Sequence, residues 1–108
     1  MAEGILVVGE VADGKISSTT AELLGAARRL NAGTVSCALA GHGVADAARS
    51  AIEYGADKVY VVDDVNLATY TTDGYVQAIR RVVEQAAPAA VLLGQTDMGR
   101  DLAPALAA

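Results

Sequence analysis

The chain alternates between short, uninterrupted apolar runs and longer segments in which apolar residues recur every three or four positions. The apolar runs occupy residues 5–9, 34–40, 58–62 and 90–94. Continuous runs of this length are typical of parallel strands whose two faces are both covered by helices. The pattern therefore predicts an α/β fold in which four strands are joined by right-handed helical crossovers.

The first two helical segments carry recognisable start and stop signals. Hydroxyl residues at 17–20 precede the first segment and can cap free helix amides, and residues 31–33 resemble a helix end. The second segment is expected to end at Gly55. The predicted inward faces are Leu23, Ala27 and Leu30 in the first segment, and Val44, Ala48, Ala51 and Ile52 in the second.

The last two helical segments are predicted in the same way. Thr72 or Asp73 is expected to cap the third, and Pro104 is expected to lie in the first turn of the fourth, where Leu102 and Leu106 are one turn apart. In the third segment Val76, Ile79, Val83 and Ala86 are expected to face inward, and Arg80, Arg81 and Glu84 outward.

These elements predict a three-layer α/β/α domain with a Rossmann-like, doubly wound parallel sheet, an architecture that resembles adenine-nucleotide alpha-hydrolase-like domains. A strand order of 3-2-1-4 would place a ligand crevice between the loops at residues 9–18 and 94–101, beyond the carboxyl ends of the strands. A polar turn is expected at residues 12–15.

Composition narrows the classes of partner. The chain has 108 residues with a formal net charge of -5, which suits one small domain and disfavours nucleic acid or an anionic membrane. Cys37 is the only cysteine, so an internal disulfide is excluded. No apolar run approaches the roughly 20 residues of a membrane span and no secretion signal is evident, so a cytoplasmic protein is expected.

Several motifs suggest chemistry only weakly. Residues 94–101 have the outer spacing of a P-loop, but Arg100 replaces its lysine and Asp101 its hydroxyl residue, so a strand-to-helix turn is favoured. The Gly41–Asp46 segment and the Asp63–Asp64 pair are interpreted as turns rather than a dinucleotide loop and a metal site. The Ser17–Thr20 hydroxyls favour helix capping over phosphate binding.

No catalytic set and no metal site emerges from the remaining residues. His42 is interpreted as an exposed loop histidine and Cys37 as a buried, unreactive thiol. Thr96, Arg100 and Asp101 remain as weak candidates for contacts in the crevice or at an interface.

Taken together, these blocks resemble the amino-terminal domain of electron-transfer flavoprotein alpha subunits. The resemblance rests on the first strand, on the segments at residues 19–30 and 55–64, and above all on residues 92–104, whose sequence is Leu-Leu-Gly-Gln-Thr-Asp-Met-Gly-Arg-Asp-Leu-Ala-Pro. Ala105 departs from the pattern, because relatives often carry arginine after the proline.

The resemblance implies a component of an electron carrier rather than an enzyme. The parent would be a heterodimer with a beta subunit and one FAD, taking electrons from acyl-CoA or related dehydrogenases, as in fatty acid beta-oxidation, and passing them to a quinone reductase. FAD would be held mainly by a carboxy-terminal domain that this chain lacks, and AMP, where present, by the beta subunit. Residues 1–108 would then be an incomplete amino-terminal domain that serves assembly and binds no cofactor.

Two alternatives stay open. The same architecture resembles stand-alone adenine-nucleotide-binding modules of the universal-stress type, an interpretation that the predicted crevice and the hydroxyls at residues 17–20 support. An exposed sheet edge and an uncapped last helix also allow self-association.

Overall fold

Four parallel strands form the centre of the protein. The computed structural model describes residues 4–107. Its main sheet has the order β5-β4-β1-β6, formed by β1 (Ile5–Val8), β4 (Val35–Gly41), β5 (Lys58–Asp63) and β6 (Ala90–Leu92). All three strand pairings are parallel. In chain order this is 3-2-1-4, which confirms the predicted fold.

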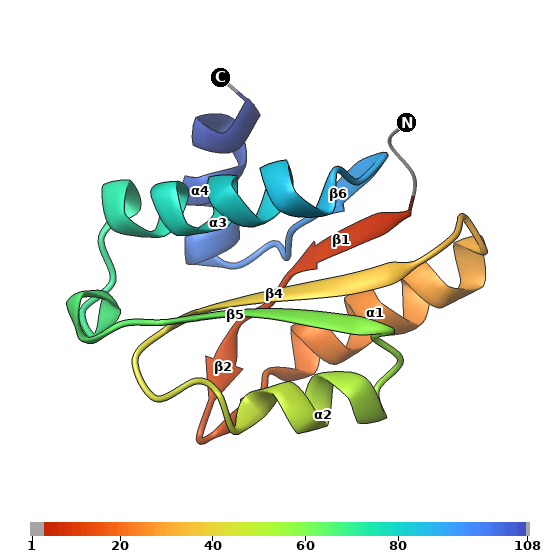
Figure 1. Ribbon diagram of the computed structural model, residues 1–108, viewed down its shortest axis with the longest axis horizontal. Coiled ribbons are helices and arrows are strands. Elements are labelled where there is room, and N and C mark those ends of the chain that lie inside the picture. Colours follow the sequence, from red (N-terminus) through yellow and green to blue (C-terminus); the bar gives the residue numbers. More distant parts are fainter. Residues whose placement is uncertain (1–3, 108) are drawn as a thin grey trace.

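Helices cover both faces of this sheet, as Figure 1 shows. Helices α1 (Ser18–Leu30) and α2 (Ala47–Glu53) lie on one face, and α3 (Thr72–Ala86) and α4 (Asp97–Ala107) on the other. Successive residues of β1 point to opposite faces, so that Ile5 and Val7 join the core under α1 and α2, while Leu6 and Val8 join the core under α3 and α4. The three predicted layers are thereby confirmed.

A small hairpin that the sequence analysis did not predict follows β1. Strands β2 (Val11–Ala12) and β3 (Lys15–Ile16) pair antiparallel, and positive φ angles at Asp13 (53°) and Gly14 (77°) are those of a tight hairpin turn. The predicted polar turn is the tip of this hairpin. The amide of Ile16 donates to Ser50 Oγ at 3.0 Å, which attaches the hairpin to α2.

The predicted inward face of α1 is confirmed at Ala27, only partly right at Leu23 and wrong at Leu30. Thr20, Leu24 and Ala27 are buried, whereas Leu30 is 63% exposed and Leu23 is only partly buried. The helix is turned in this way because Thr20 Oγ1 accepts a hydrogen bond from the Glu10 amide at 2.8 Å, which holds Thr20 inward. The Asn31 cap, with φ of 50°, confirms the predicted helix end.

Helix α2 begins later than the pattern predicts. Val44 is buried in the preceding turn, before the first helical residue, Ala47, and the helix buries Ala47, Ser50 and Ala51. Ile52 was expected to face inward but is 49% exposed, because it lies next to the buried stripe rather than in it.

Helix α3 agrees more closely with its prediction. Thr71, one residue before the predicted caps, accepts a hydrogen bond from the Gly74 amide at 3.2 Å. Its buried residues are Ala78, Ile79 and Val82, while Val76, Val83 and Ala86 are half-buried and Arg80, Arg81 and Glu84 are outside this buried set.

Helix α4 corrects the placement of Pro104. The helix begins at Asp97, so Pro104 lies in its interior and not in its first turn. Pro104 is exposed, so the hydrogen bond that proline cannot donate is missing on the solvent side. Within residues 4–107, none of the helices is long and apolar enough to cross a membrane.

Candidate functional site

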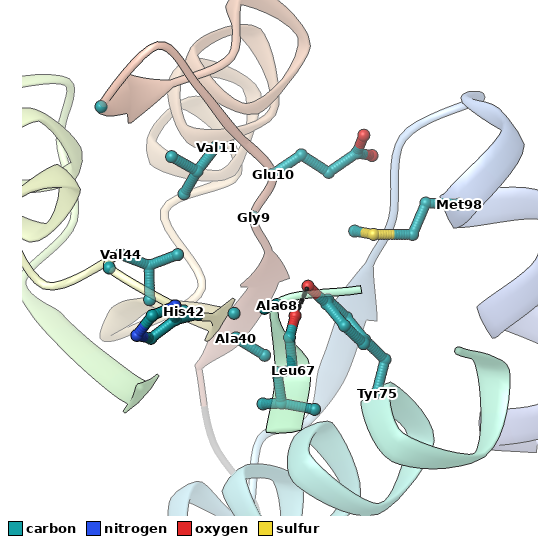
Figure 2. A pocket seen from close by; sticks show the side chains of 13 residues that line it. Gly9, Glu10, Val11, Ala40, His42, Val44, Leu67, Ala68, Tyr75 and Met98 are labelled. Atoms are coloured by element: carbon teal, nitrogen blue, oxygen red, sulfur yellow. Dashed lines mark hydrogen bonds between the residues drawn. The ribbon is translucent and has the colours of Figure 1, made fainter. Parts of the chain in front are cut away.

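A hollow of about 350 Å³ opens at the carboxyl ends of β1 and β4. Figure 2 shows Glu10 and Val11 beyond β1, His42 and Val44 beyond β4, and Met98 on the side of α4. Leu67 of the short helix η1 (Val65–Leu67) and Tyr75 of α3 complete its wall. The hollow therefore includes residues of both loops that were predicted to flank a crevice, but it extends over β4.

The space directly between those two loops is bridged by a hydrogen bond. Thr96 Oγ1 donates to Glu10 Oε2 at 2.6 Å and accepts from the Gly99 amide at 3.0 Å. One hydroxyl thus caps α4 and ties it to the loop after β1. The structure places the candidate Thr96 at the position where the strand order reverses, in contact with a carboxylate.

Gly99 lets α4 begin this close to the sheet. A Cβ atom at Gly99 would lie 1.9 Å from the Gly94 carbonyl oxygen, a distance that no real contact shows. Gly94 is also confined, since a Cβ there would lie 2.7 Å from Thr19 Cγ2. The two glycines therefore serve close packing of backbone.

Asp101 is exposed, but hydrogen bonds within the domain hold its side chain. Its carboxylate accepts hydrogen bonds from Thr72 Oγ1 and Tyr70 Oη, each at 2.5 Å, and these bonds lower its pKa. Burial and this carboxylate raise the pKa of Tyr70 to about 12. Asp101 therefore joins α4 to the start of α3.

Arg100 takes part neither in the Thr96–Glu10 bond nor in the bonds of Asp101 to Tyr70 and Thr72. Its guanidinium donates to the Gln95 carbonyl oxygen at 3.3 Å and lies 3.9 Å from the Asp97 carboxylate, with 68% of the side chain exposed. The three candidates Thr96, Arg100 and Asp101 thus do not converge on one point. Thr96 faces the loop after β1, Asp101 faces α3, and Arg100 faces solvent.

The turn after β4 is organised by an acidic residue whose role the sequence analysis missed. Asp63 accepts hydrogen bonds from the amides of Gly43, Val44 and Ala45 at 2.9, 3.1 and 3.3 Å. The Gly43 bond is the main reason why the pKa of Asp63 is lowered. The interpretation of residues 41–46 as a tight turn is confirmed, and His42 is exposed, as expected.

The other acidic and hydroxyl residues near the hollow also serve caps. Asp64 accepts from the Asn66 amide at 2.9 Å, and Ser17 Oγ accepts from the Thr20 amide at 3.2 Å. Capping by the 17–20 hydroxyls is therefore confirmed. Among the residues that the structure describes, no group of three or more His, Cys, Asp or Glu side chains could hold a metal ion.

Cys37 lies in the core under α1 and α2 and has no exposed surface. Burial raises the pKa of its thiol to about 12. The expectation of a buried thiol is confirmed, and a thiol with so high a pKa is a poor nucleophile near neutral pH.

The hollow does not fit a flavin dinucleotide. Its volume lies at the lower end of the range for ligand pockets. Among the described residues that line it, Glu10 supplies the one carboxylate, and none supplies a Lys or Arg cation. The two phosphates of FAD would therefore meet a negative charge. The nearby amide clusters that could bind phosphate already donate to Ser17, Asp63 and Thr96.

Fold and site together define a Rossmann-like α/β domain whose phosphate-binding positions are occupied by its own side chains. Comparison with known families matches residues 5–108 to the electron transfer flavoprotein domain. The chain belongs to this family, and its resemblance to the amino-terminal domain of alpha subunits is confirmed.

Curated relatives match nearly the whole chain. It is 44% identical to the electron transfer flavoprotein subunit alpha of Bacillus subtilis (strain 168), over 100% of this chain and 34% of the relative. It is 39% identical to the acryloyl-CoA reductase electron transfer subunit beta of Anaerotignum propionicum, over 96% of this chain and 29% of the relative. It is 35% identical to the lactate dehydrogenase (NAD(+),ferredoxin) subunit LctC of Acetobacterium woodii, over 97% of this chain and 26% of the relative. The chain spans about a quarter to a third of the length of these relatives.

Proposed function

We propose that residues 1–108 form an amino-terminal assembly part of an electron-transfer flavoprotein alpha subunit. The observation that carries this proposal is the 44% identity to such a subunit over the full chain. The family consists of electron-carrying flavoproteins, so the proposed role is that of a carrier component and not of an enzyme. Its partner is a beta subunit.

In this proposal the electron chemistry lies outside the present residues. FAD is bound mainly by a carboxy-terminal domain of the alpha subunit, and AMP, where present, by the beta subunit. The poor fit of the hollow to a diphosphate supports this division of labour. The complex acts in the cytoplasm and passes electrons from acyl-CoA or related dehydrogenases, including those of beta-oxidation, to a quinone reductase or a comparable acceptor.

The flavin part of the proposal is tested by titrating the purified chain with FAD. We expect no retained yellow colour after gel filtration and no change in flavin fluorescence. The full-length alpha subunit produced with its beta subunit is the positive control and should retain flavin. Stoichiometric FAD on the 108-residue chain would contradict the proposal.

The assembly part is tested by co-producing the full-length alpha and beta subunits and measuring complex formation by gel filtration. Ile52 and Tyr54 of the α2 end are 49% and 58% exposed, which makes them candidates for an apolar contact with the partner. We expect the Ile52→Ser, Tyr54→Ser double variant to weaken the complex, and the adjacent exposed Glu53→Gln variant to leave it unchanged. A double-variant complex as stable as the wild-type complex would exclude this face as the contact with the beta subunit.

A stand-alone adenine-nucleotide-binding module is the alternative, because the hollow lies where such folds bind ligands. Calorimetry with AMP and ATP distinguishes the two functions. Binding of either nucleotide by the 108-residue chain supports the alternative. No heat at millimolar nucleotide supports the assembly role.

A further inference from the structure

The hollow at the carboxyl ends of β1 and β4 has an unusual charge for its position in the fold. In open α/β sheets this edge often binds phosphates, because helix N-termini direct their amides toward it. Here the loop after β1 instead places a carboxylate in the wall of the hollow. Glu10 extends from the end of β1 toward the side of α4, as Figure 2 shows.

Three contacts fix the position of Glu10. Its side chain accepts the Thr96 hydroxyl at 2.6 Å, its amide donates to Thr20 Oγ1 at 2.8 Å, and its carbonyl oxygen accepts from the Ser17 amide at 2.8 Å. Backbone and side chain are therefore both held, and the carboxylate cannot move out of the hollow without breaking the bond to Thr96.

Among the described residues of the wall, no Lys or Arg offsets this charge, and the nearby guanidinium of Arg100 is engaged by Gln95 and Asp97. The remaining lining offers apolar surface, to which Val11 and Met98 contribute, and the imidazole of His42. Asp63, which binds the amides of the 43–45 turn, adds a second negative charge behind the wall.

We propose that Glu10 determines which molecules enter the hollow: its fixed carboxylate excludes anions, phosphate esters among them, and admits uncharged or cationic molecules with an apolar part. This goes beyond the proposed function, because it concerns the ligand selectivity of a surface that assembly alone does not explain. Because Glu10 acts by its charge, Glu10→Asp should keep this selectivity and Glu10→Gln should abolish it.

The test measures the electrostatic selectivity of the hollow directly with a reporter thiol. Met98 lines the hollow with its thioether directed inward, so Met98→Cys places a thiol there. The thiol is treated with methanethiosulfonate reagents that carry a sulfonate, a trimethylammonium or no charge, and each rate is divided by the rate with 2-mercaptoethanol. The parent chain, which retains Met98, gives the background, and this is low because Cys37 is fully buried.

We expect the trimethylammonium reagent to react with the introduced thiol about tenfold faster than the sulfonate reagent after this normalisation. Adding Glu10→Gln should reduce that ratio about three- to tenfold, while Glu10→Asp should retain it. The matched control Glu84→Gln makes the same change of charge on α3, away from the lining of the hollow, and should leave the ratio unchanged.

Two outcomes overturn the proposal. One is a ratio near unity in the Met98→Cys chain, and the other is an unchanged ratio after Glu10→Gln. The uncharged reagent shows whether the thiol is equally accessible in every variant. If Glu10→Gln does not fold, a salt series on the Met98→Cys chain decides, since about 1 M salt should abolish a selectivity that is electrostatic and leave a steric one intact.

Discussion

Replacing Gly99 by alanine tests whether close backbone contact builds the α4 end of the site. The added Cβ would lie 1.9 Å from the Gly94 carbonyl oxygen and 3.0 Å from its carbonyl carbon. Ordinary contacts need about 3.5 Å, so α4 must move by about 1.5 Å away from the end of β6. That shift breaks the 3.0 Å bond between the Gly99 amide and Thr96 Oγ1.

The size of the effect follows from three contributions. Overpacking against backbone, which cannot rotate away, costs about 3 kcal/mol, at the upper end of the usual range. Loss of the helix cap costs about 1 kcal/mol. The higher helix propensity of alanine returns about 1 kcal/mol. The free energy of unfolding should therefore fall by about 3 kcal/mol, which corresponds to a decrease in Tm of about 12–24 °C in a domain of this size.

Urea unfolding followed by circular dichroism measures this change, and Gly25→Ala is the matched control. Gly25 is also helical, but a Cβ there would meet only the flexible end of Arg29, at 3.5 Å. Gly25→Ala should stabilise the protein by about 0.5–1 kcal/mol. A urea midpoint for Gly99→Ala equal to that of the wild type or of Gly25→Ala would refute the predicted clash.

Combining Gly99→Ala with Thr96→Val separates the clash from the cap. Thr96→Val removes the cap and the hydrogen bond to Glu10 without adding a clash, so it should cost about 2–3 kcal/mol. Because Gly99→Ala already breaks this cap, the double variant should lose about 1 kcal/mol less than the sum of the two single variants. Additive losses would show that the cap survives the alanine.

Three further predictions address the core, a carboxylate and a thiol. Leu24→Ala, at a fully buried position, should cost about 2–5 kcal/mol by urea unfolding, whereas Leu30→Ala, at a position 63% exposed, should stay within about 0.5 kcal/mol; equal losses would disprove the observed α1 face. The pKa of Asp63 is lowered in the folded protein, so this carboxylate stabilises the fold above its usual pKa of 3.8, and the stabilisation is lost as pH falls through the lower folded value. Asp63→Asn should therefore flatten the dependence of the urea midpoint on pH in that range. An unchanged slope would contradict this. Cys37, with a pKa of about 12, should not react with a thiol reagent at about pH 8 until urea unfolds the chain, and rapid reaction of the folded protein would show an opening of the core.

The inner strands β1 and β4 were predictable because burial on both faces leaves a clear mark in the sequence. Every residue of β1 is buried, so the run at residues 5–8 is uninterrupted, and the parallel order followed from the helices between the runs. The hairpin of β2 and β3 was missed because two-residue strands show no periodicity. The Asp13–Gly14 dipeptide was the available signal, since this pair favours a tight hairpin turn.

The interior of the site was less predictable because its contacts join distant residues. Thr96 and Glu10 are 86 positions apart, and Asp101 and Tyr70 are 31 positions apart. Such side-chain pairs leave no periodic pattern, so the sequence indicated Thr96 and Asp101 but not their partners. The face of α1 was predicted only in part for a related reason, because its polar Thr20 is held inward by Glu10, and a hydrophobic pattern cannot show this.

The hydrogen bonds at this edge show how a Rossmann-like fold can use its phosphate-binding edge for contacts within its own chain. Three helix caps and the 43–45 turn direct amides toward the carboxyl ends of the strands, and each meets an acceptor from the chain itself: Ser17, Asp64, Thr96 and, at the turn, Asp63. A phosphate would have to displace these acceptors as well as approach Glu10. Removing one charge should therefore change the selectivity of the hollow without creating a nucleotide site. The same internal bonds tie the loops between strands and helices to one another, which suits the assembly role proposed above.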